Sequence, residues 1–314
     1  MAIAVVATGF GGPENLSVVE REVPAPGTGQ VVIQVRAAGV NPIDYKRYSG
    51  AFGSDPAMLP MPVGLEVAGV ITAVGEEAAG PAGPLAVGDE VVAFSVTGGY
   101  ATEVVADAAV VVPKPPEVSW ETASGLLLAG GTAVHGLTLL NVGEGDTLVV
   151  HGASGAVGFI AVQLAVAAGA TVLGTASESR HELLREHGAV PVAYGPGLLE
   201  RLREAAPSGV DAVFDAVGTD EAIDASLELV PDPKKIVSAV AFGRGDTGIQ
   251  LIGGGPGGDP GTEIRAQAWQ RLLPLAAQGR LEIPISRTFG LAEAAEAHRL
   301  VAGGHPGGKV VLLP

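Results

Sequence analysis

Three glycines at intervals of three residues follow an apolar, strand-like run in the segment TLVVHGASGAVG (147–158). Glycine lets a backbone turn tightly and approach a pyrophosphate, and the N-terminus of a following helix offers free N–H groups to that anion. An apolar segment of helical length follows, and then a second strand-like run, 171–175, as a βαβ unit requires. The pattern predicts a dinucleotide-binding turn. The residues expected to bind the cofactor there are Gly152, Ala153, Ser154, Gly155, Ala156 and Val157. The chain contains 47 glycines, so a glycine-rich turn that binds no nucleotide stays open as the alternative.

The end of the second strand-like run indicates which nicotinamide cofactor is bound. An NAD enzyme usually places Asp or Glu there to bind the ribose 2′-hydroxyl. This chain has Ala176, followed by Ser177 and, three residues later, Arg180. A guanidinium and a hydroxyl suit a 2′-phosphate, which favours charge-assisted donors. The segment therefore predicts NADPH, although Glu178 is a like charge if it points inward, and a solvated helix start capped by Ser177 is the alternative.

The elements that must position these residues fall into two classes along the chain. Residues 1–118 contain alternating strand-like runs separated by Gly, Pro and Asp turns, which is typical of an antiparallel, barrel-like domain. From 119 to 258, helix and strand patterns alternate, which is typical of a doubly wound parallel sheet. Within it, 210–218 and 235–243 read as later buried strands, each ending in glycine. We expect an α/β protein whose residues 259–314 add two helical and two strand segments.

Composition excludes several classes of partner and site. The net charge of −16 argues against nucleic acid and anionic membranes as partners, because both require clustered Lys and Arg. The absence of cysteine excludes disulfides and thiolate metal sites. The N-terminus lacks the basic segment of a signal peptide, and the apolar stretches near 123–142 and 156–168 are interrupted by polar residues and glycines, so we expect buried helices. We therefore expect a soluble, cytoplasmic protein.

Five segments carry a resemblance to a known family. They are GVNPIDYKRYSG (39–50), PVGLEVAGVITAVG (62–75), VGDEVVA (87–93), HGASGAVG (151–158) and GGKVVLL (307–313). Their order resembles the medium-chain dehydrogenase/reductase superfamily over essentially the whole chain. The resemblance implies a GroES-like catalytic domain (1–118), a Rossmann NADPH-binding domain (119–258) and a returning catalytic segment (259–314). The first and fourth segments resemble the zinc-independent quinone oxidoreductase (zeta-crystallin-like) branch.

The departures from the zinc-dependent branch decide the expected chemistry. Zinc alcohol dehydrogenases carry cysteine where this chain has Asn41, histidine where it has Leu65, and a second cysteine near 129–130. Of the corresponding ligands only Glu66 survives, whereas a catalytic zinc needs three positioned ligands. We expect no metal. Without a Lewis acid the substrate must be a good hydride acceptor, namely a quinone or a carbon–carbon double bond conjugated to a carbonyl.

The resemblance also implies roles for individual residues. Asn41 would orient the substrate carbonyl, and Tyr45 or Tyr48, in the same loop, would donate a proton, with Asp44 bracing that loop. Many relatives have tyrosine where this chain has Lys46, so the resemblance does not select between Tyr45 and Tyr48. The residues implied to contact the cofactor are Asn41, Thr132, Ser177, Arg180, Tyr194, Val217, Phe242 and Lys309. The alternatives are structural: a turn asparagine, structural tyrosines, a threonine bonded to its own helix, core strand ends and an exposed lysine.

The expected function is reduction of a quinone or an α,β-unsaturated carbonyl compound by NADPH, with Asn41 and Tyr45 as catalytic residues. One alternative is an enoyl-thioester reductase, which would require a basic patch for a phosphopantetheine or coenzyme A phosphate; only Lys46 and Arg47 suggest one. Another is a structural or regulatory protein that binds NADPH without turnover. Relatives commonly dimerise through the last Rossmann strand, here near 248–252, so we expect a homodimer.

Overall fold

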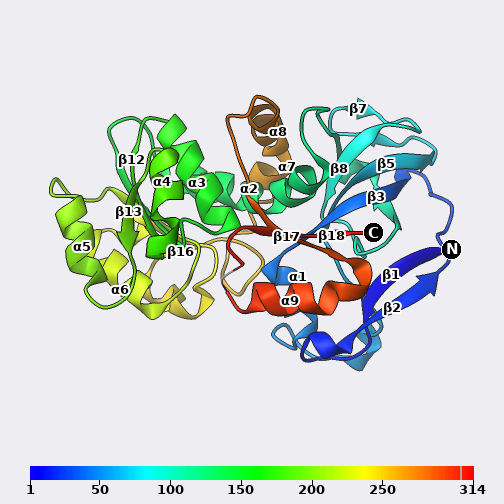
Figure 1. Cartoon of the computed structure of the whole chain (residues 1–314), viewed down its shortest axis with the longest axis horizontal. Helices are drawn as coiled ribbons and strands as arrows, with labels where there is room; N and C mark the ends of the chain where they lie inside the picture. The colour runs from blue at the N-terminus through cyan, green and yellow to red at the C-terminus, as the bar shows by residue number, and fades with distance from the viewer. Residues whose placement is uncertain (305) are drawn as a thin grey trace. The chain divides into compact units, whose positions relative to one another are not determined.

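The computed structural model describes residues 1–304 and 306–314, and the chain divides into two compact units (Figure 1). The first unit consists of Met1–Leu128 together with Arg271–Pro314, and the second consists of Ala129–Gln270. The boundaries expected from the sequence, after residues 118 and 258, lie earlier in the chain than these divisions and stay a prediction. Two helices, α2 (Trp120–Leu140) and α8 (Trp269–Ala277), run across the divisions.

The first unit is built from strands. Its seven-stranded sheet contains β3 (Gln30–Val40), β5 (Glu66–Val74), β8 (Glu90–Phe94), β9 (Glu103–Asp107), β10 (Val111–Pro113), β17 (Ile285–Gly290) and β18 (Lys309–Leu313). A three-stranded sheet contains β1 (Ala2–Ala7), β2 (Leu16–Arg21) and β4 (Met61–Pro62), and a small pair contains β6 (Ala79–Gly80) and β7 (Gly83–Pro84). The helices α1 (Pro42–Tyr48) and α9 (Ala294–Ala302) belong to the same unit.

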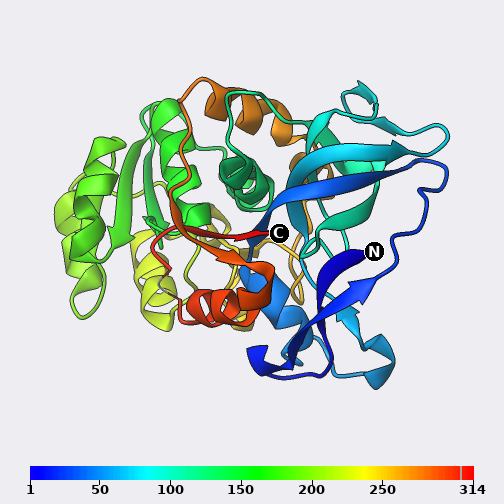
Figure 2. The same cartoon turned by 45° about the vertical axis from the view of Figure 1, so that its right-hand side comes forward.

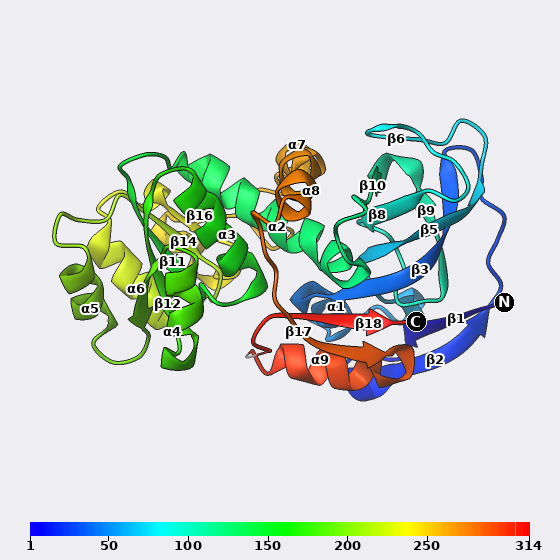
Figure 3. The same cartoon turned by 45° about the horizontal axis from the view of Figure 1, so that its top comes forward.

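The end of the chain returns to the first sheet. Strand β18 pairs antiparallel with β3, with Val310 opposite Val40, and parallel with β17. Figure 2 shows the red C-terminal strand beside the blue β3, and Figure 3 shows β17 and β18 side by side with α9 next to them. The GroES-like domain with a returning segment is therefore confirmed as the fold of this unit.

One element of the first unit was not expected. Residues 42–48, interpreted from the sequence as a loop, form the helix α1. Pro42 occupies its first turn, where a missing N–H costs nothing, and Asp44 Oδ2 accepts the N–H of Asn41 at 2.8 Å. Seven residues are too few to show a helical period, which explains why the pattern was missed. The helix fixes the direction in which the Asn41 side chain leaves the backbone.

The second unit is a parallel sheet flanked by helices, in the order β13-β12-β11-β14-β15-β16. Its strands are β11 (Thr147–His151), β12 (Thr171–Ala176), β13 (Val190–Ala193), β14 (Ala212–Asp215), β15 (Ile236–Ser238) and β16 (Gln250–Leu251). Its helices include α3 (Ala156–Ala167), α4 (His181–Glu186), α5 (Leu198–Ala205), α6 (Asp220–Leu229) and α7 (Thr262–Gln267). From β11 the chain moves in one direction to β13 and later in the other direction to β16, so the sheet is doubly wound. Ligands of such sheets bind where the direction changes, here at the carboxyl ends of β11 and β14.

The two long apolar segments form helices, as expected. Among the described residues α2 is long and apolar enough to cross a membrane, but 72% of its apolar window is buried within the protein, as in a core helix. Its N-terminus is capped by Ser119, whose Oγ accepts the N–H of Thr122 at 3.2 Å. The shorter α3 is buried in its central part, residues 158–165.

Candidate active site

The glycine turn has the geometry that a dinucleotide requires. Gly152 directly follows β11 and has a φ of +70°, a conformation that favours glycine. A Cβ on Gly158 would overlap the carbonyl oxygen of Gly152, so only glycine lets α3 start this close to the turn. The first N–H groups of α3 have no acceptor within the helix and are available to an anion. The predicted residues 152–157 form this turn and the start of α3, and they fit a pyrophosphate.

The residues expected to bind a 2′-phosphate meet at the carboxyl ends of two neighbouring strands. In the parallel pair β12–β13, Ala176 lies opposite Ala193, so the next residues, Ser177 and Tyr194, lie side by side at the edge of the sheet. Arg180 closes a 3₁₀ turn on Ser177, with its N–H donating to the Ser177 carbonyl at 2.8 Å. Tyr194 is half exposed. This corner thus presents a hydroxyl, a phenol and a guanidinium without an aspartate or glutamate at position 176.

Two predicted strand ends differ from the sequence expectation. Val217 lies two residues beyond β14 and is 47% exposed, which excludes the alternative of an ordinary core residue. A Cβ on Gly152 would lie 3.3 Å from the Val217 Cβ, so the valine borders the glycine turn. Phe242 does not end a strand: β15 stops at Ser238, and Phe242 begins a 3₁₀ turn. Its ring packs so closely against the glycine-rich loop 253–258 that a side chain on Gly255 would collide with it.

Thr132 lies on α2 and is held by residues that the sequence did not single out. Arg265 donates from Nη1 to Thr132 Oγ1 at 3.0 Å and from Nε to His135 Nδ1 at 3.3 Å. The other ring nitrogen of His135 lies 3.3 Å from Asp259 Oδ2. Burial lowers the pKa of His135, and its neutral form satisfies both contacts by accepting at Nδ1 and donating at Nε2. His135 is therefore a buried histidine whose two ring nitrogens are both satisfied, and Arg265 fixes the Thr132 hydroxyl.

Asn41, Glu66 and Lys309 form a buried polar cluster in the first unit, and each is at most 3% exposed. Lys309 Nζ donates to Asn41 Oδ1 at 2.6 Å and to Glu66 Oε2 at 3.4 Å. Asn41 Nδ2 donates to Glu66 Oε2 and to the Gly39 carbonyl, each at 3.3 Å. Gly39 leaves the room for this cluster, since a Cβ there would overlap the Ser124 carbonyl. The alternative of an exposed Lys309 is wrong.

The cluster contains the ammonium group of Lys309 beside Asn41 and Glu66, two residues that the resemblance relates to metal ligands of zinc-dependent proteins. Both amide hydrogens of Asn41 are engaged, whereas Lys309 Nζ uses two of its three N–H donors within the described residues. Glu66 Oε1 accepts the N–H of Leu128 at 2.9 Å, so this carboxylate is anchored from both oxygens. Within residues 1–304 and 306–314 no group of three potential metal ligands is present. The arrangement can offer one further N–H from Lys309 to an oxygen.

A series of buried hydrogen bonds joins four side chains of the first unit and ends at Asp44, the residue that accepts the N–H of Asn41. The Tyr48 hydroxyl lies 2.7 Å from His298 Nδ1, His298 Nε2 lies 3.0 Å from the Tyr100 hydroxyl, and Tyr100 donates to Asp44 Oδ2 at 3.0 Å. Because Tyr100 gives its only proton to the carboxylate, it must accept from His298 Nε2–H, and His298 Nδ1 must accept from Tyr48. A neutral histidine protonated at Nε2 satisfies every contact in this series.

The titration behaviour of these four side chains follows from their burial. Burial lowers the pKa of His298 to about 4, which keeps the ring neutral. Burial also raises the pKa of Asp44 to about 6, although its hydrogen bonds from Asn41 and Tyr100 act in the opposite direction. Within the described residues, Asp44 Oδ1 is the buried side-chain oxygen that lacks a hydrogen-bond partner. Asp44 braces the start of α1, as expected, and the structural interpretation of Tyr48 is correct.

Tyr45 differs from Tyr48 in having no hydrogen-bond partner for its hydroxyl among the residues that the structure describes. Its ring is partly buried and lies edge-on to His298, with the ring centroids 6.4 Å apart. Burial raises the pKa of Tyr45, so the phenol stays protonated at neutral pH. Of the two candidate tyrosines, Tyr45 is therefore the one whose O–H remains available as a donor.

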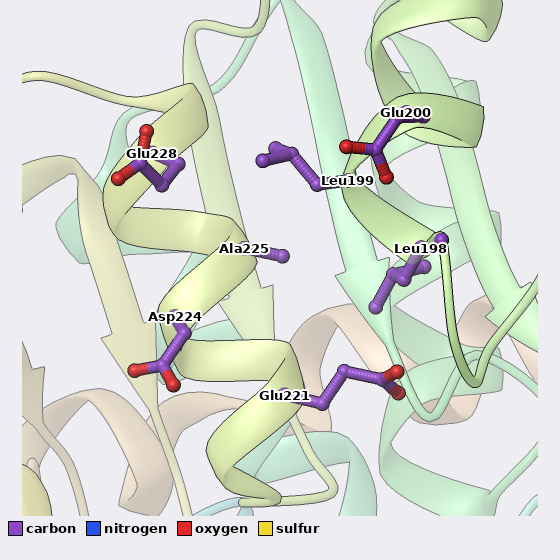
Figure 4. Close-up of a pocket in the computed structure, with 8 residues that line it drawn as sticks. Leu198, Leu199, Glu200, Glu221, Asp224, Ala225 and Glu228 are labelled. Carbon is purple, nitrogen blue, oxygen red and sulfur yellow. The ribbon is translucent and has the colours of Figure 1, made fainter.

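A cavity in the second unit lies away from the glycine turn. Figure 4 shows it between α5 and α6. Its volume is about 240 Å³. Its walls carry four carboxylates and an apolar floor, from Leu198, Leu199, Glu200, Glu221, Asp224, Ala225 and Glu228. None of its lining residues is lysine or arginine, so this cavity does not suit a cofactor phosphate.

Comparisons with known families agree with this architecture. The family described as "Alcohol dehydrogenase GroES-like domain" matches residues 27–116, and "Zinc-binding dehydrogenase" matches residues 187–312. A quinone oxidoreductase from Pseudomonas aeruginosa is 32% identical over 336 residues and is covered completely, as is this chain. The synaptic vesicle membrane protein VAT-1 homolog of Rattus norvegicus is 31% identical, over 99% of this chain and 83% of its own length.

Solved structures give the same assignment. The mycobacterial protein Rv1454c complexed with NADPH is 30% identical over the full length of both chains, with a TM-score of 0.85. The CurK enoyl reductase is 25% identical over 99% of both chains, also with a TM-score of 0.85. The glycine turn fits a nicotinamide dinucleotide, and the residues that the resemblance relates to two zinc ligands are Asn41 and Leu65. The chain belongs to the medium-chain dehydrogenase/reductase superfamily, in its zinc-independent quinone oxidoreductase-like family, and is an oxidoreductase that uses a nicotinamide cofactor.

Proposed function

We propose that this oxidoreductase uses NADPH to reduce a quinone or an α,β-unsaturated carbonyl compound. The observation that carries the cofactor choice is the β12–β13 register, which sets Ser177 beside Tyr194. Arg180 follows in the adjacent 3₁₀ turn, and the position that would bind a ribose 2′-hydroxyl in an NAD enzyme is Ala176. A 2′-phosphate gains charge-assisted hydrogen bonds at such a corner, whereas NADH carries no phosphate there to accept them.

The residues of the first unit supply the polar groups for the substrate. NADPH, when bound, supplies the hydride. Asn41 and Lys309 orient the substrate oxygen, with the remaining N–H of Lys309 as donor and Asn41 and Glu66 holding the ammonium group in place. This hydrogen bond strengthens as negative charge develops on the oxygen, which is the requirement for lowering the barrier. Tyr45, with its free and protonated hydroxyl, supplies a proton.

Reduction of an enoyl thioester is a second candidate, because the CurK enoyl reductase has the same fold over nearly the full length. Both substrate classes carry a carbonyl conjugated to a double bond, and the polar cluster would serve either. Lys46 and Arg47, in the last turn of α1, are the basic residues available for a phosphopantetheine or coenzyme A phosphate. Reduction of an enoyl thioester should therefore depend on Lys46 and Arg47, whereas reduction of a simple enone should not.

The test is to follow loss of reduced-cofactor absorbance with a quinone, an alkenal and an enoyl thioester, each with NADPH and with NADH. Turnover with NADPH preferred supports the proposal and identifies the acceptor class. Turnover confined to the thioester, and reduced by replacing Lys46 and Arg47 with methionine, would favour the second candidate. Binding of NADPH without turnover on any acceptor would favour a structural or regulatory role instead.

We also propose a cytoplasmic homodimer without nucleic-acid or membrane partners. The net charge of −16 supports the exclusion of anionic partners. The edge strand β16 supports pairing near residues 248–252, although the Leu251 carbonyl already accepts the N–H of Asp259 at 2.8 Å. Light scattering after size-exclusion chromatography measures the mass directly, and a monomer at micromolar concentration would contradict the dimer.

A further inference from the structure

Arg201 makes an unusual set of hydrogen bonds next to the proposed 2′-phosphate corner. It belongs to α5, and its guanidinium donates to three carbonyl oxygens, one at the end of β13 and two in the loop between β13 and this helix. Nε donates to Ala193 at 2.9 Å, Nη2 to Gly195 at 2.8 Å and Nη1 to Pro196 at 2.9 Å. A planar guanidinium can reach three such acceptors at once, whereas an ammonium group cannot match that fork. The side chain thus binds the loop 193–197 along its length.

The loop needs such a partner because its own sequence is permissive. Gly195 and Gly197 have φ values of +94° and +84°, and glycine in such positions leaves many other conformations accessible. The Gly195 N–H donates to Glu221 Oε2 at 3.0 Å, so the loop is also held by α6. Arg201 and Glu221 together bind the loop through its carbonyl and N–H groups.

Tyr194 is the residue whose position this loop determines. It directly follows Ala193, whose carbonyl accepts from Arg201 and whose Cα lies opposite Ala176 in the sheet. We propose that Arg201 is a positioning residue for NADPH selectivity, which holds the 193–197 loop so that Tyr194 stays beside Ser177 to bind the 2′-phosphate. The inference rests on the proposed use of NADPH. It adds a residue that touches no cofactor atom but selects between the two cofactors.

The rival explanation is charge alone, because a cation on α5 attracts a phosphate wherever its hydrogen bonds go. Two variants separate the explanations. Arg201→Met removes the charge and the hydrogen bonds, whereas Arg201→Lys keeps the charge and removes the fork. Arg203→Met is the matched control: Arg203 lies two residues further along α5, is half exposed and pairs with Glu228 at 3.7 Å. It removes a charge from the same helix and leaves the loop intact.

The experiment measures dissociation constants for NADPH and NADH by fluorescence titration of all four proteins. We expect Arg201→Met and Arg201→Lys to lose about tenfold in NADPH affinity, the size of one charge-assisted contact, with NADH affinity unchanged. Arg203→Met should behave as the wild type. An Arg201→Lys variant with wild-type NADPH affinity would overturn the inference in favour of charge, and so would equal losses for both cofactors.

A second measurement tests the role of Arg201 even where a variant is less stable. The wild-type cofactor preference then distinguishes failure of this inference from failure of the proposed use of NADPH. Hydrogen exchange of the Gly195 amide should accelerate in both Arg201 variants, because the loop loses its carbonyl partner; unchanged exchange would contradict the positioning role. A wild-type protein that binds NADPH and NADH equally would overturn the proposed cofactor preference and the inference with it. A wild type that prefers NADPH, with an unaltered preference in both variants, would overturn the role of Arg201 alone.

Discussion

Replacing His298 by glutamine should flatten the pH dependence of stability. The ring is fully buried, contacts Tyr48 and Tyr100 through its two nitrogens, and has Tyr45 against its edge. Asp44 lies beyond Tyr100 in the same chain of hydrogen bonds. Glutamine retains a donor near the Nε2 position for Tyr100 and does not titrate. The variant therefore removes the ionisable group while preserving the contact that reaches Asp44.

The magnitude follows from the pKa values. His298 has a pKa of about 4 in the folded protein, against an ordinary value of 6.5, so below pH 6.5 the unfolded chain takes up a proton that the folded protein refuses. Between pH 7 and pH 5 this histidine removes about 2 kcal/mol from the free energy of unfolding. Asp44 acts in the opposite direction: its raised pKa of about 6 means that the folded protein takes up the proton first, which adds about 1 kcal/mol over the same interval.

Urea unfolding followed by circular dichroism at pH 7 and pH 5 measures the effect. We expect the gap in stability between wild type and His298→Gln to change by about 2 kcal/mol in favour of the variant as the pH falls. His151, whose pKa burial also lowers to about 4, is present in both proteins and cancels. Tyr48→Phe is the comparison: it removes the donor to His298 Nδ1 but keeps the ring buried, and since burial is the cause of the lowered pKa, most of the wild-type pH dependence should remain. A gap that stays constant between the two pH values would refute the reasoning.

Three further substitutions address the cofactor and substrate groups. Arg180→Glu should weaken NADPH binding at least about tenfold and NADH binding far less, since a carboxylate repels the 2′-phosphate, and equal losses in fluorescence titrations would contradict the assignment. Tyr45→Phe should lower kcat about tenfold or more on enones and less on quinones, whose oxygens take protons from water; unchanged rates on both would remove Tyr45 from the mechanism. Gly158→Ala should destabilise the protein by about 1–3 kcal/mol in thermal unfolding and impair cofactor binding, because the new Cβ overlaps the Gly152 carbonyl. Gly155→Ala is the matched control. Residue 155 has a φ of −78°, and a Cβ there would lie 3.4 Å from the Gly152 carbonyl oxygen, so this variant should keep the wild-type stability.

Local signals explain what could be predicted from the sequence. The strands β11 and β12 and the helix between them were expected within a residue or two, because buried parallel strands are continuous apolar runs that end at glycine turns. The end of β15 was missed, since the apolar residues 239–242 continue the pattern after the strand has stopped at Ser238. The short helix α1 was missed because it is held by a cap and by tertiary contacts rather than by an amphipathic pattern.

The candidate site was predictable only in part, because some of its residues are neighbours in the sequence and others are hundreds of positions apart. The residues of the glycine turn lie within a few positions of one another, and their spacing is readable. Lys309 contacts Asn41 across 268 positions, and His298 contacts Tyr48 across 250. No local pattern carries such pairs. Lys309 was expected near the cofactor from resemblance, but its burial against Asn41 and Glu66 depends on the packing of strands from both ends of the chain.

The return of β18 to the side of β3 has a consequence for the order of events on the ribosome. The second unit is a continuous stretch, Ala129–Gln270, and can fold as soon as it has emerged. The first unit cannot, since residues 38–40 at the end of β3 lack their partner until Lys309–Leu313 has been made, although residues 30–34 of the same strand already pair with β9. Until then the nascent chain exposes an unpaired strand edge, the surface that invites wrong pairing with other chains. Strand β18, which is made after the other strands of this unit, therefore pairs with the end of β3 and delivers Lys309 to Asn41 in the same step, so the polar cluster forms only when the sheet is complete.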